Sequence, residues 1–366
     1  GNYAIVVAAA QTTGLNGGYE LEVVLADGTS AAYVLADKAK FVDASDNEVA
    51  NTDEDTFDEV CKSLALGSDP ARVDYDDIAD SIYEVSVKNG KISKLVKLAS
   101  EGSADGREYD AENMSYGAIT FNEATVIVSV DGSTGKAVEA DDITIGTVAD
   151  FMVDGEGDKY DLVAFDYDNN DVAGLVIGKG LDTAVPQDGV AVIVTSVKTK
   201  EIDNDTAVVV TGFQAGEEVT FTVYDDEVTY GADDFAKGDV VLFGVANAEG
   251  LVSNFEILYS AEDKEIVAAE AEEDEYYYAG ALDTANEPTN SKFYLDNPDE
   301  LVDDAKHAYV AADGVVMRNA ARYTLVDFSE GKTPDVSKKS KGTGLFSRYD
   351  SKYDYEVFVR YFDDAQ

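Results

Sequence analysis

The sequence predicts an all-β protein made of small β-barrel or β-sandwich domains in tandem, with few short helices. Three observations lead to this prediction: alternating runs rich in Val, Thr and Tyr, turn residues directly after those runs, and a closing phrase that recurs four times. Residues 19–25 alternate in this way and are followed by Asp27-Gly28, which is a strong hairpin signal. Val, Thr and Tyr favour the pleated, half-buried surface of a sheet.

The closing phrase is an aromatic or apolar strand, a polar turn with Gly or Asn, and a second apolar strand. It occupies residues 81–96, 160–176 and 238–255, and its first strand recurs at 355–366. A repeated hairpin predicts a row of similar β units. Each unit is expected to open with a short strand, at 3–7, 116–119, 190–194 and 277–282.

Four β domains follow from this spacing: 1–100 with one inserted helix, 101–182, 183–262, and 263–366 with an open last hairpin. Two polar segments, 100–113 and 260–275, are expected to be linkers. The second contains the acidic run 268–275, which is typical of a solvated spacer.

The best helical signal covers residues 53–66, where apolar residues recur at helical spacing: Phe57, Val60, Cys61 and Leu64. Thr52 or Asp53 is expected to cap the start and Gly67 to end the helix. Cys61 is the single cysteine of the chain, so no intrachain disulfide can form. Its place on the apolar face predicts a buried small hydrophobe rather than a reactive thiol.

The charge balance is extreme, with 27 Lys+Arg against 75 Asp+Glu and a net charge of -48. Such a chain repels phosphate backbones and anionic membrane surfaces, so nucleic acid and membrane insertion are not expected. No apolar run approaches the roughly 20 residues that span a bilayer. Acidic density favours solubility and cation uptake. With the start Gly1-Asn2-Tyr3, typical of a processed terminus, this predicts a secreted, extracellular or cell-surface protein.

One acidic segment resembles the first half of a calcium loop. Asp166, Asp168 and Asn170 place oxygen ligands on alternate positions, as hard cations require, and Ca²⁺ is the candidate cofactor. Ile177 stands where a bidentate Glu would close an EF-hand. The same residues are expected in a hairpin turn, where Asp and Asn tolerate positive φ. Both interpretations stay open.

No enzymatic activity is predicted. Among 75 acidic residues, carboxylate pairs occur by chance and carry no signal for glycoside hydrolysis. His307 is the only imidazole, and nothing in the sequence places a nucleophile beside it. The aromatic run 276–278 suits a strand better than a sugar platform.

The last closing phrase lacks its second strand, which predicts a bare, apolar strand edge open to association. Either residues beyond it are missing, another subunit supplies the strand by β-addition, or an internal rearrangement caps the edge. Under β-addition, the first strand would dock on the last. The assembly residues are then Tyr3, Ile5 and Val7 on one side, and Tyr355, Val357, Val359 and Tyr361 on the other. On this hypothesis, deletion of residues 1–8 leaves a folded, soluble chain that no longer assembles.

The pattern Tyr-x-Val-Val, Asp-Gly, Tyr-x-Val, followed by Gly-Asp-Val-Val-Leu-Phe and Gly-Leu-Val, resembles the repetitive β regions of large surface proteins of Gram-positive, clostridia-like bacteria. Those regions accompany S-layer-homology domains. The ending 357–364 is similar in style to their C-terminal strands. The resemblance implies a structural role at the cell surface and transfers no functional residue.

The expected function is therefore an extracellular structural protein that assembles with copies of itself into a surface layer or filament. The alternative is an adhesin or carbohydrate-binding surface module, whose partners would be cell-wall or host glycans.

Overall fold

Strands dominate the computed structural model of the protein, which confirms the predicted all-β class. Up to residue 267 the structure describes 3–12, 17–68, 70–110, 112–151, 159–186, 189–214, 217–263 and 265–267. From residue 276 on it describes the backbone of seven strands: 276–282, 292–300, 307–309, 315–318, 325–327, 344–349 and 355–361.

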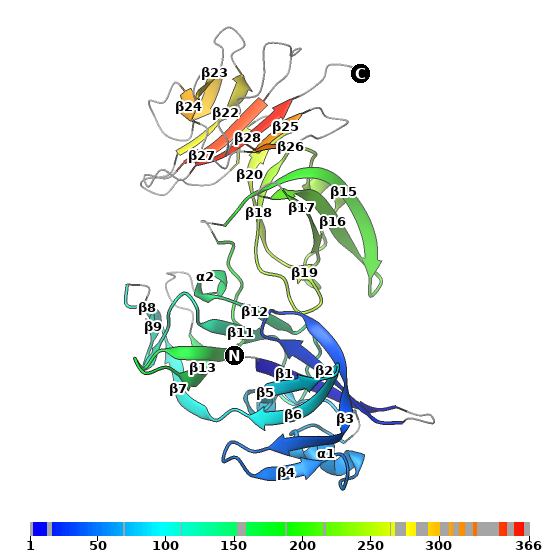
Figure 1. Ribbon diagram of the computed structural model, residues 1–366. Helices are drawn as coiled ribbons and strands as arrows, with labels where there is room; N and C mark the ends of the chain where they lie inside the picture. The colour runs from blue at the N-terminus through cyan, green and yellow to red at the C-terminus, as the bar shows by residue number, and fades with distance from the viewer. Residues whose placement is uncertain are drawn as a thin grey trace. The chain divides into compact units, whose positions relative to one another are not determined.

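The chain forms two compact units. The N-terminal unit comprises 1–184 and 244–251, and the C-terminal unit comprises 185–243 and 252–366. Four main sheets follow one another along the chain, and we call each sheet with its short helices a repeat. The strands of the four repeats are β1–β6, β7–β14, β15–β21 and β22–β28 (Figure 1).

The first repeat is a six-stranded sheet in the order β2-β1-β5-β6-β3-β4. Its strands are β1 (Tyr3–Gln11), β2 (Tyr19–Leu25), β3 (Ser30–Val42), β4 (Glu48–Asn51), β5 (Ile82–Lys88) and β6 (Lys91–Lys97). Because β2 also pairs with β3, and β3 runs parallel to β6, the pairings of β1, β2, β3, β6 and β5 form a closed cycle. The helix α1 (Phe57–Ser63) and the 3-10 turn η1 (Tyr75–Asp80) lie between β4 and β5.

The helix starts later than the predicted 53–66. Thr56 is its N-cap, and a capping box joins Thr56 to Glu59: the Glu59 N–H donates to Thr56 Oγ1, and the Thr56 N–H donates to Glu59 Oε2. This Thr-x-x-Glu signal outweighs Thr52 and Asp53 as a start. Cys61 is 3% exposed, and burial raises the pKa of its thiol, as expected for a small hydrophobe.

The second repeat is a five-stranded sheet in the order β12-β11-β14-β13-β7. Its strands are β7 (Ser100–Arg107), β11 (Val126–Val130), β12 (Ile143–Gly146), β13 (Tyr160–Tyr167) and β14 (Ala173–Lys179), with helix α2 (Val148–Phe151) before β13. A separate small sheet joins β8 (Tyr109–Asp110), β9 (Ser115–Tyr116) and β10 (Ile119–Thr120). The predicted linker 100–113 therefore contains strand β7, and the predicted opening strand 116–119 is not part of the main sheet.

The third repeat is a seven-stranded sheet in the order β19-β17-β16-β15-β18-β20-β21. Its elements are β15 (Val192–Ile202), β16 (Asp205–Gln214), β17 (Glu217–Val223), η2 (Ala232–Asp234), β18 (Val240–Phe243), β19 (Leu251–Val252), β20 (Phe255–Ser260) and β21 (Glu265–Ile266). The hairpin partner of β18 is β20, which begins at Phe255, where the predicted closing phrase 238–255 ends. The intervening residues 244–251 belong to the N-terminal unit, where Ala248 is 6% exposed and its N–H donates to the Ile143 carbonyl.

The fourth repeat is a seven-stranded sheet in the order β24-β23-β22-β27-β28-β25-β26. Its strands are β22 (Tyr276–Leu282), β23 (Lys292–Glu300), β24 (His307–Tyr309), β25 (Val315–Arg318), β26 (Leu325–Asp327), β27 (Gly344–Tyr349) and β28 (Tyr355–Tyr361). The acidic run 268–275 lies outside the described residues.

The four repeats share one pattern of strand pairing. In each, an opening strand runs antiparallel to the first strand of the closing hairpin: β1 with β5, β7 with β13, β15 with β18, and β22 with β27. The closing hairpins are β5–β6, β13–β14, β18–β20 and β27–β28. The recurrence predicted from the sequence is thus a recurrence of topology. The four predicted domain boundaries themselves stay predictions.

Two of the opening strands, β1 and β15, have a register shift at a corresponding position. The register shifts between Val6 and Ala8 in β1, and between Val194 and Ser196 in β15. Just before the shift, the Val6 N–H donates to the Ser81 carbonyl at 3.0 Å, and the Val194 N–H donates to the Asp239 carbonyl at 2.9 Å. A β-bulge at one place in two repeats is a feature of the fold, because it bends the strand and increases its twist.

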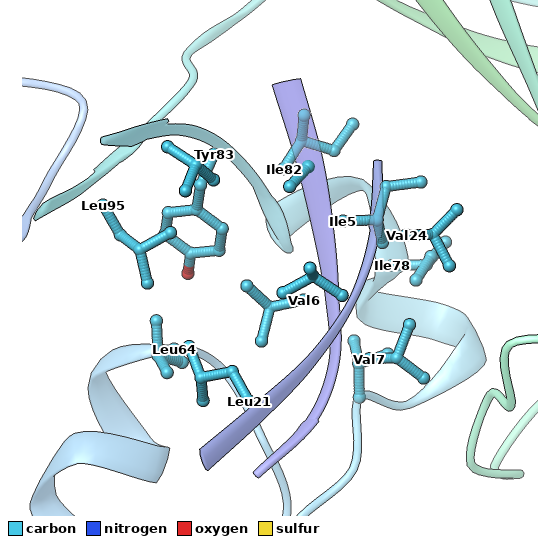
Figure 2. Close-up of a cluster of buried hydrophobic side chains, with 14 of the residues drawn as sticks. Ile5, Val6, Val7, Leu21, Val24, Leu64, Ile78, Ile82, Tyr83 and Leu95 are labelled. Atoms are coloured by element: carbon cyan, nitrogen blue, oxygen red, sulfur yellow. The ribbon is translucent and has the colours of Figure 1, made fainter. Parts of the chain in front are cut away.

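One hydrophobic cluster spans the first and second repeats. It includes Val6 and Phe41 from the first repeat and Phe165 and Ile177 from the second, all at most 2% exposed. Figure 2 shows the centre of this cluster, where side chains from β1, β2, α1, η1, β5 and β6 meet. The Tyr83 hydroxyl also points into it without a described hydrogen-bond partner, and burial raises the pKa of Tyr83 strongly.

Candidate functional site

The first of the two predicted assembly strands lies inside the sheet. β1 pairs with β2 along Ala4–Gln11 and with β5 at Tyr3–Ile5. Ile5, Val6 and Val7 are at most 2% exposed. In the folded chain this strand is held on both sides and its central side chains are buried, so Tyr3, Ile5 and Val7 can dock on another copy only if β1 leaves its sheet. Their assembly role stays a prediction.

The second predicted assembly strand is also paired on both sides. β28 runs antiparallel to β27 (Gly344–Tyr349) and parallel to β25 (Val315–Arg318). Tyr355, Val357, Val359 and Tyr361 therefore do not form the open edge that the sequence predicted. The missing partner of the last hairpin is supplied internally by β27, which precedes β28 in the chain.

The predicted calcium segment forms a hairpin turn in which the Asp168 carboxylate accepts hydrogen bonds from backbone N–H groups. Asp168 Oδ1 accepts the N–H of Asn170 at 2.8 Å and the N–H of Val172 at 3.0 Å. These hydrogen bonds, led by that from Val172, lower the pKa of Asp168. Asp166 lies within β13 with φ of 55°, between the pairs Phe165–Leu175 and Tyr167–Ala173. Among the described residues, no three Asp, Glu, His or Cys side chains form a metal-holding group.

The same turn occurs at two other places. Asp43 Oδ1 accepts the N–H of Ser45 and of Asn47, and Asn247 Oδ1 accepts the N–H of Glu249 and of Leu251. The residue three positions after the acceptor has positive φ each time: Asp46, Asp171 and Gly250. Since an amide oxygen accepts the same two N–H groups at Asn247, the turn can form without a carboxylate.

Replacement of Asp168 tests the two interpretations of this segment. We expect Asp168→Ala to lower the thermal unfolding temperature, whereas Asp168→Asn keeps the two N–H partners and changes it little. Because the folded pKa of Asp168 is lowered, the stabilisation by its ionised form is present above pH 4 and is lost as pH falls through the folded pKa. Calcium titration of both variants is the measurement. A calcium-dependent rise in unfolding temperature that disappears in Asp168→Asn would establish the metal site instead.

A groove on the first repeat lies between β1, β2, β3 and the segment before η1. It is open to solvent and has a volume of about 440 Å³. Small residues line most of it: Ala8, Ala9, Ala10, Ser30, Ala31, Ala32 and Ala71. The polar side chains are those of Glu20, Glu22 and Arg72. This volume lies within the range of small-molecule sites.

Arg72 dominates the electrostatics of this groove. Its guanidinium lies 3.8 Å from a Glu22 carboxylate oxygen, 3.9 Å from Glu139, and 3.5 Å from the Val138 carbonyl that accepts its hydrogen bond. The Arg72 side chain remains 28% exposed. These long ion pairs leave donor capacity for a ligand with acceptor oxygens. Sequence reasoning missed the groove, although alanine runs at 8–10 and 31–32 and an isolated cation at 72 were signals for it.

No protein-family model matches the chain, and no curated protein matches it. None of the helices in the described part of the chain is long and apolar enough to cross a membrane. The aromatic run 276–278 lies in β22 and His307 begins β24.

Proposed function

We propose that this chain is an extracellular structural protein that assembles with copies of itself into a surface layer or filament. The supporting observation is the recurrence of one strand-pairing pattern in four repeats. Tandem copies of one β architecture extend a molecule while each copy keeps its own sheet, which suits an architectural role. The proposal is structural rather than catalytic, and it agrees with the resemblance to clostridial surface-protein repeats.

The charge of the chain sets the conditions under which assembly is expected. A net charge of -48 keeps copies apart at low salt. Divalent cations and salt screen this repulsion, since the Debye length falls to about 8 Å at physiological ionic strength. Calcium acts here as a counter-ion and needs no dedicated loop.

Sedimentation velocity and negative-stain microscopy of the full chain test the proposal. We expect species larger than one chain that grow with protein concentration and with added CaCl₂ or NaCl, and that shrink with a chelator at low salt. A single species of one chain, at every concentration and ionic condition, would contradict the proposal.

The alternative function is an adhesin or carbohydrate-binding module, and the groove around Arg72 is the observation that favours it. Its polar groups could orient a small ligand. Its lining is alanine-rich and offers no aromatic ring, whereas sugars are commonly bound against aromatic platforms. We therefore place this function second. Retention of the chain on immobilised glycans, with loss in Arg72→Ala, separates it from self-assembly.

A further inference from the structure

Strand β7 of the second repeat lacks a second neighbouring strand, which the opening strands of the other three repeats have. The opening strands β1, β15 and β22 each have antiparallel neighbours on both sides: β2 and β5, β16 and β18, β23 and β27. β7 pairs only with β13 and ends its sheet. Among the described residues no strand therefore pairs with β7 on the side that β2, β16 and β23 occupy beside their opening strands. At the end of β7, Gly117 lies against Ala104 and Arg107, and the Arg107 N–H donates to the Tyr116 hydroxyl.

The exposed charged side chains of β7 are two carboxylates and, at its end, one cation: Glu101, Asp105 and Arg107. Ala104 is 8% exposed and belongs to a hydrophobic cluster of the second repeat with Tyr116 and Leu162, so the residues next to it in the strand face solvent. Ser103 and Asp105 are exposed on that face, and Glu101 is exposed at a register shift of the ladder with β13. No ion pair joins Glu101 or Asp105 to another described residue.

Strand β15 of the third repeat has an edge that is only partly paired. It pairs with β18 only at Val192 and Ile193, and its second half pairs with β16 alone. In the first repeat the corresponding part of β1 is covered, because the Ala9 N–H donates to the Ala71 carbonyl and the Val73 N–H to the Val7 carbonyl. The described chain offers no such cover to β15 from Ser196 to Ile202.

This uncovered half of β15 has a net positive charge in an acidic chain, with two lysines and one glutamate: Lys198, Lys200 and Glu201. Lys198 and Lys200 are exposed and lie on one face of the strand, because they are two positions apart. Neither has an ion-pair partner among the described residues. In the full sequence only 27 residues are Lys or Arg, so two unpaired lysines on one open edge are a local reversal of sign.

We propose that β15 of one copy adds to the open edge of β7 of a second copy, with one of Lys198 and Lys200 opposite Ser103 and the other opposite Glu101 or Asp105. The inference rests on the self-assembly proposed above, and this strand pairing would be the contact between copies. Main-chain hydrogen bonds would supply the affinity and the side-chain charges the selectivity. Opposite charges across neighbouring strands stabilise the pair, and like charges destabilise it.

The charges also decide which edges can meet. Two β15 edges would oppose lysine to lysine, and two β7 edges would oppose carboxylate to carboxylate, so neither strand pairs with its own kind. The remaining contact joins two different surfaces. In a dimer formed by such a heterologous contact, each copy still has one unpaired edge. The contact therefore extends into an open chain of molecules or closes into a ring.

Charge exchange on the full chain tests this contact. We expect Lys198→Glu with Lys200→Glu, or Glu101→Lys with Asp105→Lys, to weaken association in sedimentation velocity by at least about tenfold. The chain with all four substitutions should regain it. All four side chains are exposed, so the unfolding temperature serves as a check that each variant folds. Lys88→Glu with Lys136→Glu, on exposed lysines elsewhere, is the control for net charge.

Cysteine cross-linking gives a second readout. A chain with Ser103→Cys is mixed with a chain carrying Lys198→Cys or Lys200→Cys under mild oxidation, since Cβ atoms of paired strands lie within disulfide reach. Cys61 is buried and does not compete. We expect a mixed disulfide-linked dimer from one of the two mixtures, and none with Lys136→Cys. If the unmodified chain polymerises while charge exchange and cross-linking have no effect, the edge contact is overturned and self-assembly stands. If the unmodified chain never associates, both proposals fail.

Discussion

A chain that lacks residues 1–8 is expected to lose the folded N-terminal unit. The deletion removes most of β1, which pairs with β2 and β5 in the middle of the first sheet. Ile5, Val6 and Val7 are buried, and burial of three such side chains contributes about 5–9 kcal/mol. That is comparable to the total stability of a typical domain, about 5–15 kcal/mol. This expected result replaces the sequence-based hypothesis of a folded chain that merely fails to assemble.

The measurement is hydrogen exchange on the truncated chain. Amides of β2 and β5 should lose protection, because their partner strand β1 is gone. Deletion of residues 1–2 alone is the matched control and should leave protection unchanged, since it keeps every described pairing of β1. A truncated chain with full protection across 19–97 would show that β1 is dispensable and would restore the donated-strand hypothesis.

The second large effect is expected from Phe165→Ala. Phe165 is 1% exposed in β13 and belongs to the cluster that also holds Val6, Phe41 and Leu95 of the first repeat. Truncation of a buried Phe to Ala costs about 3–5 kcal/mol, from lost transfer energy and the cavity that remains. Because the cluster spans both repeats, the substitution in the second repeat should destabilise the first as well.

Hydrogen exchange measured in denaturant distinguishes joint destabilisation of the two repeats from independent unfolding of two domains. We expect Phe165→Ala to lower the opening free energy of amides in 3–97 and in 100–179 by similar amounts. Val87→Ala, at a side chain that is 49% exposed, is the control and should change stability by less than about 0.5 kcal/mol. Loss of protection confined to 100–179 would indicate that the predicted boundary near residue 100 separates two folding units.

Local signals in the sequence predicted the hairpins well. Asn89-Gly90 joins β5 to β6 with positive φ at both residues, as a two-residue turn requires. The turn after β13 formed where Asp168 and Asn170 predicted it, although the same residues also resembled a calcium loop. Oxygen ligands and turn-stabilising acceptors are the same atoms, so only the positions of the neighbouring N–H groups could separate the two interpretations.

Strand edges could not be predicted in this way. β7 reads as a polar linker because Gly102, Ser103 and Gly106 dilute its pattern, yet it pairs with β13 along most of its length. β28 reads as an open edge because no hairpin partner follows it, yet β27 and β25 pair with it from earlier in the chain.

The sequence by itself determined the strand class, the repeated hairpins and the acidic surface, because alternation, turn chemistry and charge are properties of neighbouring residues. The tertiary structure alone decided which strands are central and which are edges, and where the groove around Arg72 lies. Those properties depend on hydrogen bonds and contacts between segments far apart in the chain, such as Ala9 with Ala71 and Arg72 with Val138. A pattern of period two indicates that a strand has two different faces, but it does not indicate which strands pair with its two edges.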